Sequence, residues 1–585
     1  MKNIKFKVIY SKSISSAIIA FMVLSCSTSH YKDSLNPPND VAHQVDYENK
    51  ASKVMIASQG KFATDAGLKM YDLGGNIFDA FAAVSFVISV ERPQSTGLGG
   101  GGFLVFRTSQ VPQGEAWDFR EMAPKRAYEN MFLDKNGEII KNLSLDGMKA
   151  VGVPGLVAGV LDIHKKYGKL PLNLVLAPAI ELAKKGFPVY PHLHSAILDR
   201  ADVLKKYPAS KKIFFHPDGS PLAVGEILVQ KDLAKTLMKI SSHGKDVFYR
   251  GEVADKILAT SSRYGGLLTQ DDLENYQVKK RLPLVGTYKG YKIITMPPPS
   301  SGGVHILQIL NTLENDDLKS SGPVDPENIH LVASSMQRAF ADRAEFMGDS
   351  DFHDIPINKL LSKSYAKHLR SLIKKGRATP MNDVKPGQFD FIESDDTTHF
   401  SIIDSDGNMI ASTQTINGYF GSGVVAKGTG IVLNNEMDDF ANKVGASNLF
   451  GAIGGKNNLV QPKKRPLSSM SPTLVLKGET PVLSLGTPSG TRILTCVTNV
   501  LLNYLEYQMP LYESVAMTRY HQQWSPDEIR FDESSVPDKT LTKLKAMGHK
   551  IHLKNLGCQI QATAFEGNLL HGVSDPRGEG KALGR

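Results

Sequence analysis

The amino-acid composition changes abruptly before residue 397, where a polar linker is followed by a β-hairpin pattern. Gly376 to Asp396 is rich in Gly, Pro, Asp and Ser, a composition typical of an exposed connection. Directly afterwards, Thr398–Ile403 predicts a strand, Asp404–Asn408 a turn and Met409–Ile416 a returning strand. An exposed segment that leads at once into an apolar hairpin predicts a fold with a buried antiparallel sheet at this point.

The register of this hairpin brings two threonines together. A hairpin centred on Asp406 sets Thr397 opposite Thr415, with about 5 Å between their Cβ atoms, and a slip of one residue would destroy the pairing. Threonine is common in strands for its β propensity alone. A functional alternative exists because an N-terminal threonine supplies nucleophile and base together. Attack of the Thr397 hydroxyl on the Asp396 carbonyl, followed by hydrolysis, would create such a terminus.

The composition is that of a protein with a large core. Of 585 residues, 41% are hydrophobic and 22% charged, which excludes a disordered, collagenous or disulfide-framework protein. The formal net charge is +9, but the first 25 residues hold four lysines and no acid, so the remainder carries only +5. This is too little charge to predict nucleic-acid binding. Cys496 and Cys558 allow one disulfide, and no cysteine cluster predicts a metal site.

The N-terminus resembles an export signal. Four lysines precede the apolar stretch Ile14–Leu24, which is about half the length of a membrane-spanning helix. Val23 to Cys26 resembles a bacterial lipoprotein box, so we expect residues 1–25 to be removed and Cys26 to be lipidated; cleavage nearby without a lipid and a short core helix are the alternatives. A polar linker over residues 26–53 follows. No later apolar run reaches 18 residues, so we expect a soluble body in the periplasm, free or membrane-anchored.

Helical patterns dominate the first two-thirds of the chain. Ile77 to Ile88 repeats apolar residues as a helix buried nearly all round would. Gly97–Gly102 formally matches G-x-G-x-x-G, but it follows a helix and leads into a strand, the reverse of a nucleotide-binding loop. Residues 150–375 read mainly as helices, for example Leu172–Lys185 and Val332–Met347, interrupted by Met296–Gly303.

Six segments, in one order along the chain, resemble the γ-glutamyltranspeptidase family of N-terminal nucleophile hydrolases. They are Arg120–Pro124 (REMAP), Pro297–Gly303 (PPPSSGG), Thr397–Ser401 (TTHFS), Asn434–Phe440 (NNEMDDF), Arg465–Thr473 (RPLSSMSPT) and Gly572–Arg577 (GVSDPR). The similarity runs from about residue 54 to 577. Several long motifs in the correct order make this resemblance specific.

The resemblance implies an α+β fold, a four-layer αββα sandwich of the N-terminal nucleophile hydrolase type that both cleavage fragments build. It implies a precursor that cuts itself between Asp396 and Thr397 into a large subunit, residues 54–396, and a small subunit, residues 397–585, which remain together as a heterodimer. Thr397 would be the nucleophile, and Thr415 would hydrogen-bond to it. No cofactor is implied. The implied donors are glutathione and other γ-glutamyl compounds, and the acceptors are water, amino acids or dipeptides.

The resemblance also assigns the groups that bind the donor. Arg120 suits its α-carboxylate, because a planar guanidinium forms two parallel bonds that lysine cannot reproduce. Ser468 and Ser469 would add hydroxyl donors to this carboxylate. The α-ammonium would be bound by Asn417, Glu436 and Asp439, whose charges and amide oxygen suit a cation in a partly closed site.

Two features depart from the family pattern. Backbone N–H groups within Gly486–Gly490 would form the oxyanion hole, but Ser489 precedes Gly490 where relatives usually have two glycines. Ala441–Lys464 resembles the lid loop over the glutamyl site, and Phe450 stands where relatives often have tyrosine. A phenylalanine can exclude water but donates no hydrogen bond.

Four other functions are consistent with parts of the sequence. A Ser/His/Asp hydrolase would use His399, but two residues along a strand place it roughly 7 Å from Thr397. A metallohydrolase has only the pair His192 and His194, without the helical spacing of H-E-x-x-H. A β-lactam side-chain acylase would share the nucleophile and differ in its pocket. An exported solute-binding lipoprotein would bind γ-glutamyl peptides without turnover and would remain one chain.

Overall fold

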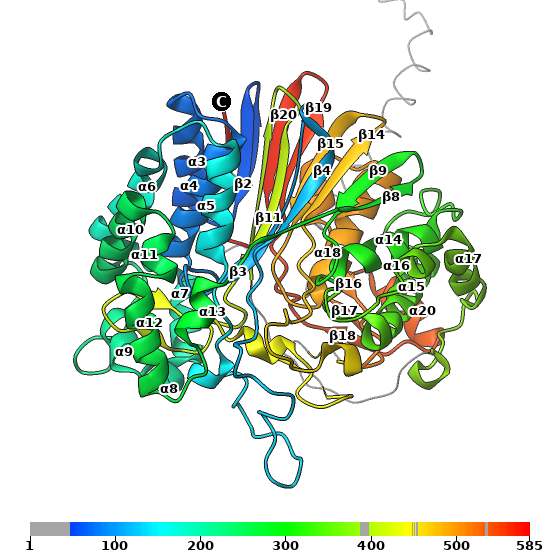
Figure 1. The fold of residues 1–585 in the computed structure, drawn as a ribbon. Coiled ribbons are helices and arrows are strands. Elements are labelled where there is room, and N and C mark those ends of the chain that lie inside the picture. The colour runs from blue at the N-terminus through cyan, green and yellow to red at the C-terminus, as the bar shows by residue number, and fades with distance from the viewer. Residues whose placement is uncertain (1–46, 386–396, 447, 450, 452–453, 533–535) are drawn as a thin grey trace, which may run out of the picture. The chain divides into compact units, whose positions relative to one another are not determined.

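Two seven-stranded antiparallel sheets face each other in this structure (Figure 1). The computed structural model describes residues 47–385, 397–446, 448–449, 451, 454–532 and 536–585. The first sheet has the order β1 (Glu48–Ala51), β20 (Leu569–Ser574), β19 (Gln561–Glu566), β15 (Thr480–Gly486), β14 (Thr473–Lys477), β9 (Tyr291–Thr295) and β8 (Leu284–Tyr288). The second has the order β21 (Lys581–Gly584), β2 (Val54–Ser58), β10 (Thr398–Asp404), β11 (Met409–Thr415), β3 (Gly101–Thr108), β4 (Val111–Asp118) and β7 (Lys279–Arg281).

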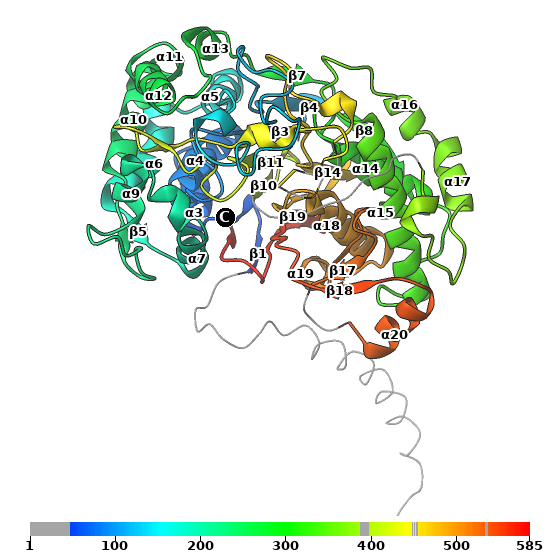
Figure 2. The ribbon, with the colours of Figure 1, turned by 90° about the horizontal axis from the view of Figure 1, so that it is seen from below.

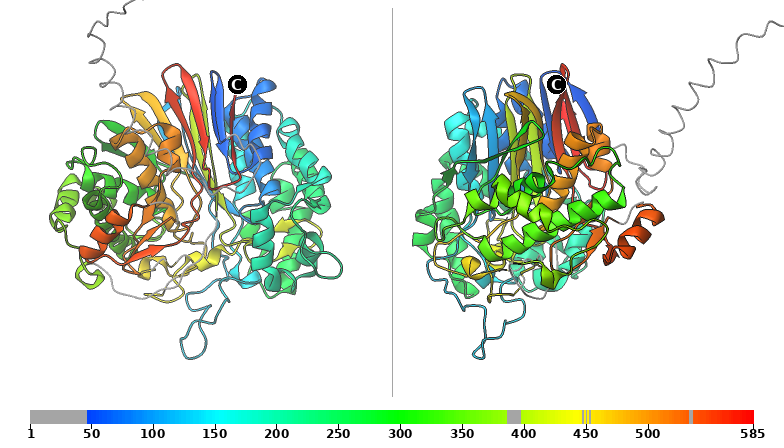
Figure 3. Two further views of the ribbon diagram at one scale, coloured as in Figure 1. Left: turned by 180° about the vertical axis from the view of Figure 1, so that it is seen from behind. Right: turned by 90° about the vertical axis from the view of Figure 1, so that its right-hand side faces the viewer.

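Helices cover the outer face of each sheet, which confirms the four-layer αββα arrangement (Figures 1, 2 and 3). The second sheet packs against α3 (Lys61–Asp72), α4 (Ile77–Glu91) and α5 (Leu156–Tyr167). The first sheet packs against α14 (Gly302–Leu313), α18 (Arg492–Leu501) and α19 (Leu511–Ala516), with α15 (Pro326–Phe346) outside α14. Segments from both sides of residue 397 enter both sheets, so the two expected subunits share one fold.

The remaining helices and short strands surround these layers. The helices are α6 (Leu172–Lys185), α7 (Pro191–Asp199), α8 (Ala201–Leu204), α9 (Pro208–Phe214), α10 (Lys231–His243), α11 (Asp246–Tyr249), α12 (Glu252–Arg263), α13 (Gln270–Glu274), α16 (Ile357–Leu360), α17 (Lys363–Ser371) and α20 (Asp538–Ala546). The short strands are β5 (Phe187–Pro188), β6 (Ile227–Leu228), β12 (Val425–Ala426), β13 (Ile431–Val432), β16 (Tyr520–His521), β17 (Ile529–Phe531) and β18 (Ile551–Leu553). None of the described helices combines the length and apolar character that a membrane span needs.

Helix α4 confirms the prediction of a fully buried helix. Every residue from Ile77 to Glu91 is buried, and the helix begins with a capping box between Asn76 and Asp79. The glycine run Gly97–Gly102 follows α4 and leads into β3, whose first two residues are Gly101 and Gly102, so the predicted order of helix, glycines and strand is confirmed. Helix α6 has the predicted bounds. Helix α15 begins six residues before the predicted Val332, because Asp325 caps it and Pro326 fits its first turn.

Two boundary expectations differ from the structure. Residues 279–295 were expected within a mainly helical region, but they form β7, β8 and β9. Burial alternates along Leu284–Tyr288, as it does in a half-exposed strand. Strand β1 lies inside the expected linker 26–53 and pairs with β20, so part of that segment belongs to the sheet. The remainder of that expected linker, up to residue 46, and residues 1–25 lie outside the described residues.

The hairpin β10–β11 has the predicted register. Thr398 pairs with Gln414 and Ile403 with Met409, and continuation by one residue sets Thr397 opposite Thr415. Side chains alternate along β10: Phe400 belongs to the core beneath α4, whereas Ser401 donates to the Gln561 carbonyl of the facing sheet at 3.1 Å. Thr397 is an even number of residues from Ser401, so this alternation directs it toward the space between the sheets.

Candidate functional site

A cavity lies where the hairpin begins, and segments from both sides of residue 397 line it. Nine of the predicted site residues line this cavity; Ser489 lies next to one of them, Gly490, and Asp396 lies outside the described residues. The lining residues are Arg120, Arg343, Thr397, Thr415, Asn417, Glu436, Asp439, Asn448, Leu467, Ser468, Ser469, Met470, Gly490, Thr491 and Ile493. The structure therefore brings together residues that the sequence separates by hundreds of positions.

Thr415 is held in place by the turn that follows its strand. The Asn417 backbone N–H donates to Oγ1 of Thr415 at 2.8 Å, and Asn417 has a φ of 74°, a value uncommon outside glycine. The Asn417 amide donates to the Asn435 carbonyl at 3.1 Å, while its Oδ1 is buried without a hydrogen-bond partner among the described residues. This oxygen is therefore available to a donor group that enters the cavity.

Arg120 is buried and lies between two carboxylates. Its Nη1 donates to Glu436 and its Nη2 donates to Asp439, which pairs each nitrogen with a carboxylate oxygen. Its Nε donates to the Pro466 carbonyl at 3.0 Å and Nη2 also donates to the Leu467 carbonyl at 3.2 Å. Burial alone would lower the pKa of Arg120, but the two carboxylates outweigh it and raise the pKa. The guanidinium is therefore permanently charged.

The same pairing sets the state of the two acids. Burial raises the pKa of Glu436 to about 7 and also raises that of Asp439, although Arg120 opposes both shifts. Asn448 of the expected lid segment donates from Nδ2 to Asp439 Oδ1 at 2.8 Å. Leu449 donates its backbone N–H to Asp438 at 2.6 Å. The acidic turn Glu436–Asp439 therefore lines the cavity and also binds the expected lid segment. Phe450 lies outside the described residues.

Ser468 and Ser469 line the same cavity. Ser301 donates from its backbone N–H and its hydroxyl to the Ser468 carbonyl, each at 2.8 Å. The Ser468 backbone N–H donates to the Pro299 carbonyl at 2.8 Å. The Ser469 hydroxyl accepts a hydrogen bond from Arg343 at 3.2 Å. The segment Pro297–Gly303 therefore positions the serine pair, which explains why both motifs belong to one site.

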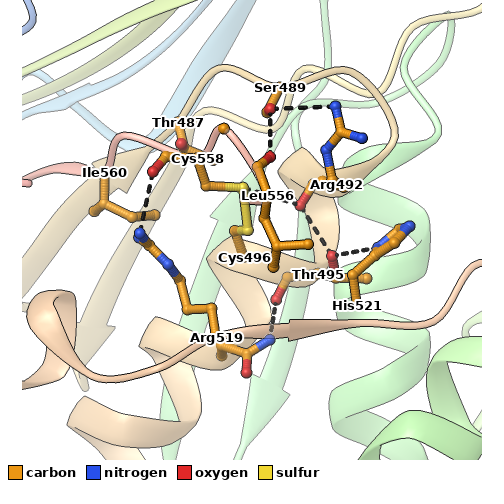
Figure 4. The surroundings of a disulfide bond; sticks show 12 residues. Thr487, Ser489, Arg492, Thr495, Cys496, Arg519, His521, Leu556, Cys558 and Ile560 are labelled. Carbon is orange, nitrogen blue, oxygen red and sulfur yellow. Dashed lines mark hydrogen bonds between the residues drawn. A yellow bond between two sulfur atoms is a disulfide. The ribbon is translucent and has the colours of Figure 1, made fainter. Parts of the chain in front are cut away.

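The expected oxyanion loop follows β15. Ser489 has a φ of 113° and Gly490 a φ of 51°, so two consecutive residues adopt conformations that glycine tolerates best. The Ser489 hydroxyl donates to the Leu556 carbonyl at 2.7 Å, away from the backbone of the hole. The predicted departure from two glycines is thus accommodated by a specific hydrogen bond (Figure 4).

A disulfide lies directly beneath this loop. Cys496, on α18, is bonded to Cys558, with 6.6 Å between their Cα atoms (Figure 4). The residue after Cys558, Gln559, donates its backbone N–H to the Thr487 hydroxyl at 2.9 Å. The expected oxyanion loop and the segment Leu556–Gln559 are therefore joined by two hydrogen bonds, and the disulfide connects that segment to the helix after the loop.

The competing catalytic groups do not assemble a site. His399 is buried and hydrogen-bonds through its ring to Thr413 at 2.8 Å and Ser401 at 3.2 Å, and burial lowers its pKa to about 3. It therefore orients strands as a neutral imidazole. His194 bonds to the Leu222 carbonyl at 2.8 Å, and no cluster of three or more potential metal ligands occurs in the described part of the chain.

Arg343, Asn448 and Thr491 are the polar lining residues that the sequence did not single out. Arg343 lies on the buried length of α15, three residues after Phe340. An arginine among apolar residues at helical spacing is the only sequence signal that could have indicated it. Asn448 lies in a segment rich in Gly and Asn, where no single residue stands out.

Comparisons with known proteins find similar sequences and similar folds. Residues 63–585 match the family described as Gamma-glutamyltranspeptidase. The Glutathione hydrolase proenzyme of Escherichia coli (strain K12) is 43% identical over 540 residues, which is 92% of each chain. The solved gamma-glutamyltranspeptidase of Helicobacter pylori is 44% identical, with a TM-score of 0.55, over 56% of this chain and 93% of that chain. The solved cephalosporin acylase from Bacillus halodurans has a TM-score of 0.80 at 26% identity, over 94% and 98% of the two chains.

Proposed function

The chain belongs to the γ-glutamyltranspeptidase family, and from this premise we propose that Thr397 carries out both self-cleavage and γ-glutamyl transfer. The enzyme is a glutathione hydrolase and γ-glutamyl acyltransferase made as a proenzyme. The observation that carries the residue assignment is the convergence of Thr397, Thr415 and Arg120 on one cavity, from strands and loops far apart in the sequence.

Self-cleavage creates the catalytic amine. The Thr397 hydroxyl oxygen attacks the carbonyl carbon of Asp396, and the peptide C–N bond breaks as the ester forms. Water then hydrolyses this ester, which leaves a carboxylate on Asp396 and a free α-amine on Thr397. This amine acts as the base for the hydroxyl of its own residue in every later turnover.

Donor binding uses the polar walls of the cavity. The α-ammonium lies against Asn417, Glu436 and Asp439, and the α-carboxylate lies against Arg120 and the hydroxyls of Ser468 and Ser469. Opposite charges that are largely removed from water attract strongly, which fixes the γ-carbonyl relative to Thr397. The support for this arrangement is that acids and cations already line the same small space.

Acyl transfer proceeds in two steps. The Thr397 amine takes the hydroxyl proton as the oxygen attacks the γ-carbonyl, and backbone N–H groups at Ser489 and Gly490 stabilise the oxyanion. The intermediate collapses to a γ-glutamyl ester on Thr397 and releases the donor's amine, which receives the proton. Water or the amine of an amino acid or dipeptide then attacks the ester and frees Thr397.

The assignment is tested by the mass and N-terminal sequence of the mature protein. We expect two associated fragments, the smaller beginning Thr-Thr-His-Phe, and hydrolysis of a γ-glutamyl anilide by the cleaved form. A fully active enzyme without a chain that begins at Thr397 would refute the mechanism. An uncleaved, inactive protein that binds γ-glutamyl peptides would instead favour a binding protein.

A side-chain acylase is the competing function on this fold, since a solved cephalosporin acylase superposes on most of the chain. Its acyl group need not carry an α-ammonium. The buried carboxylates Glu436 and Asp439 favour a cationic amino group. We therefore expect turnover of the γ-glutamyl anilide to exceed that of the matching glutaryl amide, and the reverse order would favour an acylase.

We further propose that residues 1–25 direct export and that Cys26 is lipidated, which would place the enzyme at a membrane facing the periplasm. The basic and apolar pattern before Cys26 supports this proposal. Incorporation of labelled palmitate into the protein, abolished by Cys26→Ala, is the expected result. Unlabelled mature protein that begins elsewhere would support simple cleavage.

A further inference from the structure

A second guanidinium lines the cavity of Arg120. Arg343 extends from α15, and its Nε donates to the Ser301 hydroxyl at 2.9 Å while Nη2 donates to the Ser469 hydroxyl at 3.2 Å. Burial lowers the pKa of Arg343 to about 10, opposed by the more distant Asp439, so the group is charged at neutral pH. Arg343 forms no ion pair with any carboxylate in the described part of the chain.

The two guanidinium groups therefore differ in whether an acidic side chain already neutralises their charge. Arg120 already has two acidic partners, Glu436 and Asp439, and its remaining contacts go to backbone carbonyls. Arg343 has only hydroxyl partners, and its Nη1 makes no hydrogen bond to any described residue. A buried cation without an anion is costly, so a site that retains one is prepared for an anionic ligand.

We infer that Arg343 is a second cation, beside Arg120, for the α-carboxylate of the γ-glutamyl donor, and that with Ser469 it selects for donors that carry this carboxylate. The inference rests on the proposed function of the cavity. The donor brings one anion and one cation. Its ammonium can pair with the carboxylates of Glu436 and Asp439. Its carboxylate can pair with the guanidinium of Arg343, which forms no ion pair with a described acidic residue.

A purely structural role for Arg343 predicts a different outcome. Its bond to Ser301 also helps to position the segment that holds Ser468, because Ser301 donates twice to the Ser468 carbonyl. Loss of that support would disturb the wall for every ligand. Loss of a carboxylate partner would affect only ligands that carry the carboxylate.

The test compares two competitive inhibitors of γ-glutamyl anilide hydrolysis, L-glutamate and its α-amide, isoglutamine. In Arg343→Gln we expect the inhibition constant of glutamate to rise roughly 10- to 100-fold, as the loss of a charge-assisted hydrogen bond implies, and that of isoglutamine to change little. Arg343→Lys retains the charge and should recover part of the glutamate affinity. Subunit cleavage reports on folding of each variant.

Arg338→Gln provides the matched control. Arg338 is equally buried on α15 and also lacks an acidic partner, but it donates to the Ser334 and Leu372 carbonyls and does not line the cavity. We expect both inhibition constants to remain unchanged in this variant. Equal weakening of glutamate and isoglutamine in Arg343→Gln, or no change in either, would overturn the inference. Failure of the wild-type enzyme to hydrolyse the anilide would instead refute the proposed function.

Discussion

The Ser489 hydroxyl donates a hydrogen bond to the Leu556 carbonyl, 2.7 Å away, and this bond holds a serine in a backbone conformation that usually requires glycine. Leu556 lies two residues before Cys558, whose disulfide partner Cys496 is on the helix that follows the oxyanion loop. The position of the backbone N–H groups that would stabilise the oxyanion therefore depends on a side-chain contact and a covalent bond outside the cavity.

Substitution of Ser489 separates backbone strain from this hydrogen bond. Ser489→Ala keeps the strained φ and removes the partner of the Leu556 carbonyl, so we expect the free energy of unfolding to fall by about 1 kcal/mol and kcat to fall about tenfold. Ser489→Gly loses the same bond but adopts φ of 113° without strain, so its kcat should lie closer to the wild-type value. Denaturant unfolding and donor kinetics measure both effects. A larger kcat loss in the glycine variant would contradict this account.

Removal of the disulfide should weaken both stability and the oxyanion loop. In Cys496→Ala/Cys558→Ala we expect the free energy of unfolding to fall by about 2–4 kcal/mol, because the bond closes a loop of 62 residues. We expect kcat to fall while the donor KM is nearly unchanged, since the charged and hydroxyl groups proposed to bind the donor belong to other segments. Reduction of the wild-type enzyme should reproduce this change, and the same reductant should have no effect on the double variant. A rise in KM alone would place the effect at another part of the site.

Thr397→Ala should give an uncleaved and inactive chain, because the proposed mechanism uses this hydroxyl for self-cleavage and for turnover. Thr398→Ala is the matched control: its Oγ1 is buried without a hydrogen-bond partner among the described residues, and alternation places it on the helix face of β10. We expect this control to mature and to hydrolyse donor. Electrophoresis measures cleavage, and anilide hydrolysis measures activity. Cleavage that persists in Thr397→Ala would refute the assignment of the nucleophile.

The sequence predicted what local periodicity determines and missed what long-range packing determines. The hairpin register and the buried helix Ile77–Glu91 follow from patterns within about 20 residues, so they could be predicted. The pairing of Arg120 with Glu436 joins residues 316 positions apart. The family resemblance placed both residues in one site but assigned them to different groups of the donor, so it did not predict their ion pair. Arg343 reaches the cavity through the packing of α15 on α14, for which the sequence contains no direct signal.

Arg120→Lys should leave maturation intact and weaken donor binding. Self-cleavage requires no α-carboxylate, whereas lysine cannot bond to Glu436, Asp439 and two carbonyls at once. We expect two normal fragments and a donor KM raised by roughly tenfold or more. Mass measurement and initial rates provide the two readouts. An uncleaved variant would show that Arg120 is needed to fold the site rather than to bind donor.

Donor binding should strengthen as the pH rises through about 7. Burial raises the pKa of Glu436 to about 7, with Arg120 opposing the shift and Asp439 adding to it, and the neighbouring buried Glu121 shares this acidic cluster. The donor ammonium favours ionised Glu436, so ligand binding releases a proton below this pH and becomes tighter above it. The inhibition constant of glutamate should therefore fall between pH 6 and 8. This constant measures binding alone, whereas protonation of the Thr397 amine would lower kcat. Glu436→Gln should flatten this dependence while subunit cleavage remains; an unchanged pH profile in that variant would assign the titration to another group.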